Sequence, residues 1–188
     1  MSTIVRAKLV VVGDSCSGKS AITQVFHSDG AHYPKNYSMT VGVELVVKSV
    51  VVPETTDSVE LYIYDSSGKE VFAEQVQRDW DHPSLLMAVY DCTSDSSFNS
   101  CSKWIERVRT QKPEMNVPGV LVANKVDLTD RRVVSPKSGE LLAQQLGLEY
   151  FEVSAKDSKN VEAPFQHLAN EFYKLYKERV EFTSSLVI

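Results

Sequence analysis

The feature that most constrains the fold is an eight-residue motif, GDSCSGKS at residues 13–20, which directly follows the mostly apolar run 4–12. It matches the pattern G-x-x-x-x-G-K-[ST], in which glycines let backbone N–H groups wrap phosphate oxygens and the next helix favours anions at its N-terminus. In this pattern Lys19 reaches the β- and γ-phosphates of a nucleotide, and the Ser20 hydroxyl binds Mg²⁺. The alternative is a glycine-rich turn with an incidental lysine, but the apolar strand before the motif and the helix after it favour the phosphate loop. We therefore expect nucleotide contacts from Gly13, Asp14, Ser15, Cys16, Ser17, Gly18, Lys19 and Ser20.

Strands and helices alternate along the chain without a linker or a repeat. The apolar pattern predicts strands at 4–12, 43–52, 59–65, 85–90, 120–123 and 150–153, and helices after 18, around 98–108, from 136 to 146 and from about 161 to 181. The second and third strands are most simply an antiparallel hairpin at a sheet edge, and Val43, Leu45, Val47 and Val51 share one face of the second. With a helix in the polar stretch after Gly68, the total is six strands and five helices. We expect an α/β fold of the P-loop NTPase type, with a six-stranded, mainly parallel sheet covered on both faces, as one domain over residues 1–188.

Composition excludes several classes of protein. The net charge is -5 and the pI is about 5.4, which argues against a nucleic-acid binder or a polybasic membrane anchor. The three cysteines are odd in number and no secretory signal precedes the phosphate loop, so we expect free thiols in the cytoplasm. Residue 2 is serine and the last cysteine is Cys101, so we expect neither a myristoyl nor a prenyl anchor.

Residues 124–127, NKVD, follow the predicted strand 120–123 and select the base. The carboxylate of Asp127 can accept hydrogen bonds from the N1–H and the amine of guanine, whereas adenine lacks that donor pair and would leave the carboxylate unpaired. Taken alone, the segment is equally well an exposed turn, since Asn and Asp favour turns. At the end of the last strand, a backbone N–H of residues 154–156 would meet guanine O6. We expect contacts to guanine from Asn124, Lys125, Asp127, Ser154, Ala155 and Lys156.

A metal site and a switch are expected beside the phosphates. Asp65 ends a hydrophobic strand, the arrangement in which a carboxylate holds Mg²⁺. The backbone N–H of Gly68 can approach the γ-phosphate because this residue has no Cβ. Thr40 lies in the polar loop 28–42, where its hydroxyl can complete the Mg²⁺ shell with GTP and release it with GDP. The predicted metal ligands are thus Ser20, Thr40 and Asp65.

These elements, in this order and spacing, resemble the Ras superfamily over nearly the whole chain. Within it, residues 13–15 (GDS), 40–43 (TVGV) and 90–91 (YD) are similar to the Rab branch. The resemblance implies a Ras-like G domain that binds GTP or GDP with Mg²⁺. It also implies that Tyr33 stacks on the guanine edge and Tyr37 closes over the phosphates. Three further residues would form an effector-reading surface: Leu45, Tyr64 and Trp80.

Four segments are similar to a narrower family, the Rab-like GTPase subunits of the intraflagellar transport B complex. They are residues 28–33, 52–65, 100–104 and 162–165. This resemblance implies a chain without a prenylated tail that pairs with a small β-sandwich subunit and with other transport-complex proteins. It implies a role in ciliary trafficking, with the protein in the cytoplasm and in the cilium or flagellum.

Lys69 departs from the pattern, because active small GTPases usually have a water-orienting glutamine at this position. A charged lysine has no acceptor for a water proton. We therefore assign no catalytic residue and expect at most a slow GTPase. Cys16 is either a redox-sensitive thiol or, as we favour, a residue of which only the backbone N–H matters.

Two classes of function remain open at this point. The chain is either a GTP/GDP switch or a structural subunit that binds GTP without cycling, and a switch that serves vesicle traffic outside the cilium is a further alternative. A P-loop kinase would not need Asn124 and Asp127.

Overall fold

The computed structural model describes residues 2–113 and 117–185. The strands are β1 Ile4–Val12, β2 Val43–Val51, β3 Ser58–Ser66, β4 Leu85–Asp91, β5 Gly119–Asn124 and β6 Glu149–Glu152. The α-helices are α1 Lys19–His27, α2 Ala73–Trp80, α3 Asp95–Asn99, α4 Cys101–Arg109, α5 Pro136–Leu146 and α6 Glu162–Ser185. Two short 3₁₀ helices, η1 Glu70–Phe72 and η2 Thr129–Arg131, lie in connecting segments.

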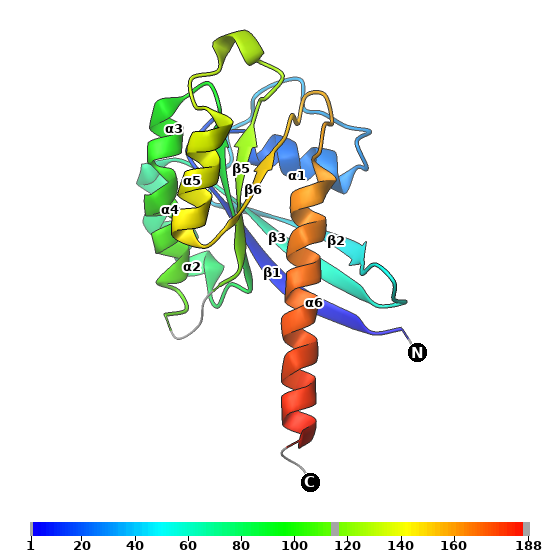
Figure 1. The fold of residues 1–188 in the computed structure, drawn as a ribbon. Coiled ribbons are helices and arrows are strands. Elements are labelled where there is room, and N and C mark those ends of the chain that lie inside the picture. Colours follow the sequence, from blue (N-terminus) through cyan, green and yellow to red (C-terminus); the bar gives the residue numbers. More distant parts are fainter. Residues whose placement is uncertain (1, 114–116, 186–188) are drawn as a thin grey trace.

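The six strands form one sheet in the order β2-β3-β1-β4-β5-β6 (Figure 1). β1 pairs in parallel with β3 and β4, and β5 pairs in parallel with β4 and β6. β2 is antiparallel to β3 and lies at the edge, with Val43 opposite Ser66 and Val51 opposite Ser58. The mainly parallel sheet and the edge hairpin predicted from the sequence are therefore confirmed.

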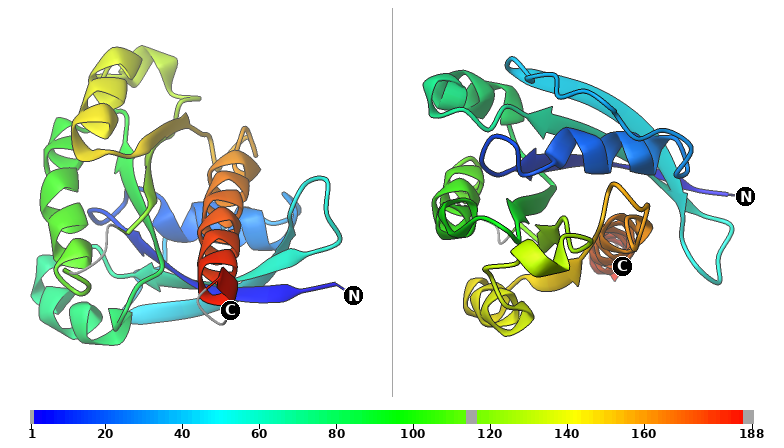
Figure 2. Two further views of the ribbon diagram at one scale, coloured as in Figure 1. Left: turned by 60° about the horizontal axis from the view of Figure 1, so that its bottom comes forward. Right: turned by 90° about the horizontal axis from the view of Figure 1, so that it is seen from above.

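Helices cover both faces of the sheet, as Figures 1 and 2 show. α1 and α6 pack on one face, where Phe26 stacks on Phe165 with ring centroids 3.8 Å apart. α2, α4 and α5 pack on the other, where Trp80 and Trp104 are among the largest fully buried side chains. This doubly covered sheet places the C-terminal ends of the parallel strands along one edge, where ligands of such folds bind.

The edge strand β2 turns its more apolar face outward. Leu45, Val47 and Val51 share one face as expected, but they are 54%, 40% and 65% exposed. The inward face carries Lys48, whose ammonium lies 4.4 Å from the centre of the Phe26 ring and donates to the Phe26 carbonyl. A lysine can occupy an inward position because its apolar stem packs while its charged end reaches a partner.

One predicted helix is divided in the structure, and helix α5 is capped at both ends. The segment 95–109 forms α3 and α4 instead of one helix, so the described residues hold six α-helices where five were expected. Hydrogen bonds from Ser100 N–H to Ser96 O and from Trp104 N–H to Ser100 O continue through the junction, so the two helices follow one another directly. Helix α5 is capped at both ends, since Ser135 accepts from the Ser138 N–H and Gly147 ends the helix in the left-handed region.

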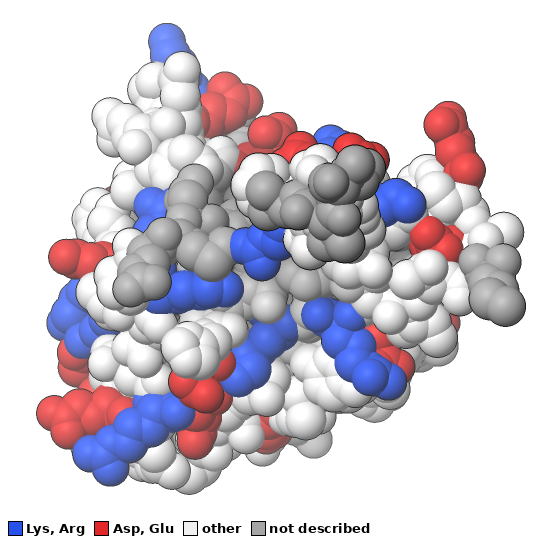
Figure 3. Space-filling model, turned by 90° about the horizontal axis from the view of Figure 1, so that it is seen from below, with Lys and Arg blue, Asp and Glu red and all other residues white. Residues whose placement is uncertain are grey.

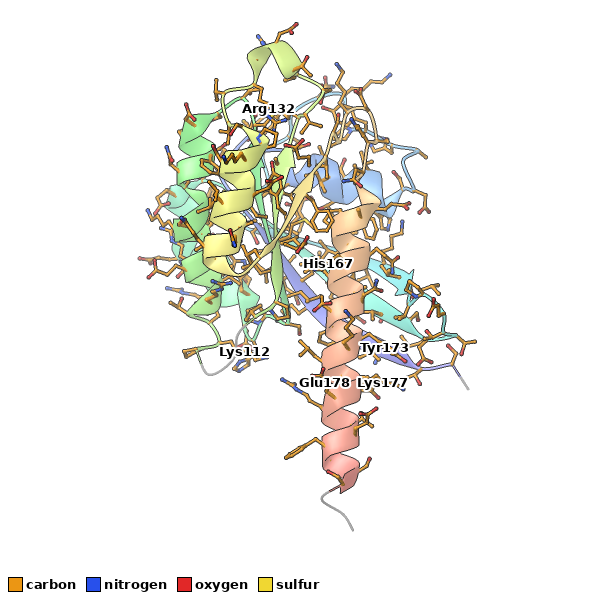
Figure 4. The ribbon with its side chains drawn as sticks, in the orientation of Figure 1. Lys112, Arg132, His167, Tyr173, Lys177 and Glu178 are labelled. Atoms are coloured by element: carbon orange, nitrogen blue, oxygen red, sulfur yellow. The ribbon has the colours of Figure 1, made fainter. Side chains whose placement is uncertain are left out.

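The long helix α6 is fixed to both the sheet and the β2–β3 hairpin. Its Tyr173 and Lys177 are labelled in Figure 4, and the Tyr173 hydroxyl donates to the Asp57 carboxylate in the hairpin turn. Gln166 donates to the Val51 carbonyl at 3.0 Å. Beyond the sheet the helix continues as a projecting rod (Figure 1). Within the described ranges, no helix combines the length and apolarity that crossing a membrane requires.

The stack of Phe165 on Phe26 gives the first prediction. Replacing Phe165, which is fully buried, with alanine removes apolar contacts and leaves a cavity, so F165A should lower the free energy of unfolding by about 3–5 kcal/mol. The matched control on the same helix is Phe182, 66% exposed, whose alanine variant should stay within about 0.5 kcal/mol of the unmodified chain. Urea unfolding followed by circular dichroism measures both, and equal losses would contradict this account of the core.

Candidate functional site

A cavity of about 420 Å³ opens where the chain leaves β1 and β3. Three segments and Lys125 enclose it, and the segments are the phosphate loop with the start of α1, the loop 33–40, and residues 66–68. Ten residues predicted to contact the nucleotide line it: Ser15, Cys16, Gly18, Lys19, Ser20, Tyr33, Tyr37, Thr40, Gly68 and Lys125. Segments far apart in the sequence thus meet at one edge of the sheet.

The phosphate loop is built around a buried lysine. Gly18 has a φ of +96°, and a Cβ there would lie 2.1 Å from the side-chain nitrogen of Asn124, so only glycine fits. Lys19 follows at the start of α1, 6% exposed, and its Nζ donates to the carbonyls of Gly13 and Asp14 at 2.9 Å each. Burial lowers the pKa of Lys19 to about 8, although the nearby Asp65 carboxylate opposes this shift. A buried cation beside a helix N-terminus is suited to an anion.

Two hydroxyls and a buried carboxylate gather beside this lysine. Ser20 Oγ and Thr40 Oγ1 lie 3.0 Å apart, although they come from α1 and from the loop 28–42. Asp65 is 2% exposed, its Oδ1 has no hydrogen-bond partner among the described residues, and burial raises its pKa to about 6. Oxygen ligands of this kind suit Mg²⁺, and a cation would satisfy the unpartnered oxygen, so the residues fit the predicted metal. No cluster of three His, Cys, Asp or Glu side chains forms a metal site within the described residues.

Asn124 and Asp127 join the two predicted base-contacting segments. The buried Asn124 amide donates to the Ser17 carbonyl at 2.9 Å and accepts from the Ala155 N–H at 3.2 Å. The Asp127 carboxylate accepts from the Ser154 hydroxyl at 2.7 Å. These bonds tie the phosphate loop, the end of β5 and residues 154–156 into one unit.

A second layer of polar contacts supports this unit from behind. Arg132, labelled above α5 in Figure 4, forms an ion pair with Glu152 of β6, and Tyr150 donates to the same carboxylate at 2.8 Å. Glu152 lies two residues before Ser154, so these contacts fix the strand that leads into the base-contacting loop. Lys125 forms an ion pair with Asp91 at 2.7 Å, which holds the residue after Asn124 against the end of β4.

Nine of the residues predicted to contact the nucleotide do not line the cavity. The Asp14 side chain accepts a hydrogen bond from the Trp104 indole at 2.8 Å and does not line the cavity. Gly13, Ser17, Asp65, Asn124, Asp127, Ser154, Ala155 and Lys156 also lie outside the lining residues. Trp80 is fully buried and donates to Ser66 Oγ at 2.8 Å. The expectation that Trp80 forms part of an exposed effector-reading surface is therefore wrong, because its indole fills the core between α2 and the sheet.

Sequence reasoning missed nine residues that line the cavity. Most of them could have been found because they are sequence neighbours of predicted residues. Helix α1 and the loop 28–42 each bring several consecutive residues to the cavity. The loop has no periodic pattern that would show which side chains turn inward. The nine residues are Ala21, Gln24, Pro34, Lys35, Asn36, Ser38, Met39, Ser66 and Ser67.

The opposite end of the molecule has a different character. Figure 3 shows basic and acidic side chains interspersed on the face seen from below. A smaller hollow of about 180 Å³ lies there beside α6, lined in part by Lys112, Phe172, Leu175 and Tyr176. The cavity lined by Lys19, with the buried carboxylate of Asp65 close by, is therefore the candidate functional site.

Comparison with known proteins agrees with this geometry. Residues 8–174 match the sequence model of the Ras family, whose GTPases bind guanine nucleotides, usually with Mg²⁺. Intraflagellar transport protein 27 homolog of Bos taurus is 51% identical over 181 residues, which cover 96% of this chain and 97% of the relative. Intraflagellar transport protein 27 of Chlamydomonas reinhardtii is 38% identical, covering 96% and 90%, and Ras-related protein RABD1 of Arabidopsis thaliana is 34% identical, covering 89% and 79%. On its sequence, its sheet and its phosphate loop, the chain belongs to the Ras family of small GTPases.

Proposed function

We propose that this chain is a Rab-like small GTPase that binds GTP and GDP with Mg²⁺, hydrolyses GTP slowly and serves as a subunit of the intraflagellar transport complex. The observation that carries the nucleotide assignment is the bond network of Asn124, which joins the phosphate loop to the segments expected to read guanine. A phosphate group beside Lys19 and a base beside Asp127 would then belong to one ligand. Because the hydroxyl of Ser154 donates to Asp127, the carboxylate is already oriented before a base arrives.

Asp127 gives the test of this assignment. The unmodified chain should prefer GTP to ATP by at least about a hundredfold, because adenine leaves a desolvated carboxylate unpaired. D127A should weaken GTP binding by at least about tenfold, since hydrogen bonds to a charged group are lost. The matched control is D130A in the exposed helix η2, which should leave binding unchanged. Competition between labelled GTP and unlabelled ATP measures the preference, and equal competition by ATP would refute the guanine assignment.

Ser20, Thr40 and Asp65 would hold the Mg²⁺. When bound, the ion neutralises charge on the β- and γ-phosphates. The chain's own contribution is to fix the hydroxyl of Thr40 against that of Ser20, which brings the loop 28–42 down onto the cavity. This contact supports a loop that orders when its threonine is engaged and opens when it is released.

Lys69 supports slow hydrolysis. Its side chain is exposed at the start of η1, next to Gly68, and it offers no acceptor to orient an attacking water. This favours a long-lived GTP state. It also supports the second candidate function, a structural subunit that retains GTP without cycling.

Lys69 gives a prediction that separates these candidates. The single-turnover hydrolysis rate should be at or below about 10⁻⁴ per second, and K69Q should raise it severalfold by restoring a side chain that can orient water. A K112Q variant, which removes a lysine at the far end of the molecule, should not change the rate. A rate equal to that of an ordinary unassisted small GTPase would contradict our interpretation of Lys69. Retention of GTP without turnover even in K69Q would favour the structural subunit.

The transport assignment is supported by the names of the relatives, which are intraflagellar transport proteins in animals and in Chlamydomonas. The family resemblance extends the proposal to a small β-sandwich partner subunit and to other proteins of the transport complex. We extend the same proposal to a location in the cytoplasm and the cilium.

This proposal predicts how the full chain behaves in ciliated cells. A tagged chain of 21.0 kDa should elute in size-exclusion chromatography of cell extracts with a complex much larger than itself, and should be seen along the cilium. A free monomer that never enters the cilium would contradict the transport role. That result would favour the alternative function, a switch that serves vesicle traffic outside the cilium.

A further inference from the structure

The carboxylate of Glu70 joins the segment after Gly68 to helix α4. It accepts two hydrogen bonds from the guanidinium of Arg107, and Lys103 donates to it at 2.9 Å. These two cations hold the pKa of Glu70 down to about 2. Most exposed ion pairs contribute little to stability, but a bidentate arginine within a network is the geometry that does contribute.

The same face of α4 also reaches the phosphate loop. The Arg107 guanidinium lies 4.9 Å from the centre of the Trp104 ring, close enough for a cation–π contact. Trp104 is 2% exposed, and its indole N–H donates to Asp14 Oδ1 at 2.8 Å. The carbonyl of Asp14 in turn accepts from Lys19. Contacts therefore run without a gap from Glu70 through α4 to the lysine of the phosphate loop.

The two ends of this path also meet directly. The Ser15 N–H donates to the Gly68 carbonyl at 3.1 Å, and a Cβ on Gly68 would lie 2.4 Å from the backbone of Asp14 and Ser15. Helix η1 contributes no buried side chain, and Val71 within it is 79% exposed. Phe72 of η1 packs, partly buried, against the core cluster that contains Val76 and Trp104. The charged contacts of Glu70 add a second restraint on how this segment lies against the phosphate loop.

We propose that Glu70, Arg107 and Trp104 are positioning residues that couple the segment carrying Lys69 to the phosphate loop. Asp14 is the receiving group, because its side chain faces Trp104 while its carbonyl faces Lys19. A change in the phosphate loop therefore alters the position of η1, and loss of the Glu70 contacts alters the geometry of the phosphate loop. The effect on nucleotide release rests on the function proposed above, whereas the coupling itself does not.

The coupling can be observed without any assumption about the ligand. The chain has two tryptophans, so a nitrogen-15 NMR spectrum shows two indole N–H peaks, and W104F identifies the peak of Trp104. E70Q and R107Q should shift that peak and leave the Trp80 peak in place. The matched control, E171Q, breaks the exposed ion pair with Lys174 on α6 and should shift neither peak. An unmoved Trp104 peak in E70Q would overturn the proposal.

Nucleotide release gives the second readout. E70Q and W104F should each speed the release of a fluorescent GDP by about two- to fivefold, and the double variant should be no faster than the faster single one. R107K keeps the charge but loses the two-pronged contact, so it should give an intermediate rate. Rates that multiply in the double variant would show independent effects and overturn the coupling. If the chain binds no guanine nucleotide, the proposed function fails, and the indole spectrum still decides the coupling.

Discussion

The site depends on the buried amide of Asn124. This one side chain donates to the phosphate loop at Ser17 and accepts from the backbone of Ala155, so it bridges segments about thirty and a hundred residues away. Removing it would leave a buried carbonyl and a buried N–H without partners, which is costly. The bridge exists because parallel pairing of β1, β4 and β5 brings the C-terminal ends of these strands to one edge. The topology thus supplies the proximity, and the amide fixes the separation of the phosphate loop from the base-contacting loop.

Much of this arrangement could be predicted from the sequence, because each motif follows a strand whose apolar pattern is plain. The phosphate loop follows β1, Asp65 ends the predicted run of β3, and Asn124 ends β5. Parallel strands then leave little freedom in where the motifs meet. The sequence also predicts the edge hairpin, since a short turn at 53–57 joins two alternating strands.

The features that could not be predicted depend on the choice among distant partners. The family resemblance implies a surface role for both Trp80 and Leu45. In the structure Trp80 donates to Ser66 and is buried, while Leu45 is exposed. Asp14 turns away from the cavity because Trp104, ninety positions further on, offers an indole N–H. The inward position of Lys48 likewise depends on the aromatic face of Phe26. Periodicity gives the faces of an element, and only tertiary packing decides which face is covered.

The two buried charges of the cavity are matched to each other and to the proposed ligand. Burial disfavours the charged form of both, lowering the pKa of Lys19 to about 8 and raising that of Asp65 to about 6. A phosphate beside Lys19 would favour the ammonium, and a divalent cation beside Asp65 would favour the carboxylate. Each group alone is costly to bury, and a ligand that brings both an anion and a cation relieves both costs together. Binding of such a ligand to the folded chain alone would also stabilise the fold by mass action. The electrostatics of the site therefore favour a metal–nucleotide complex over either component by itself.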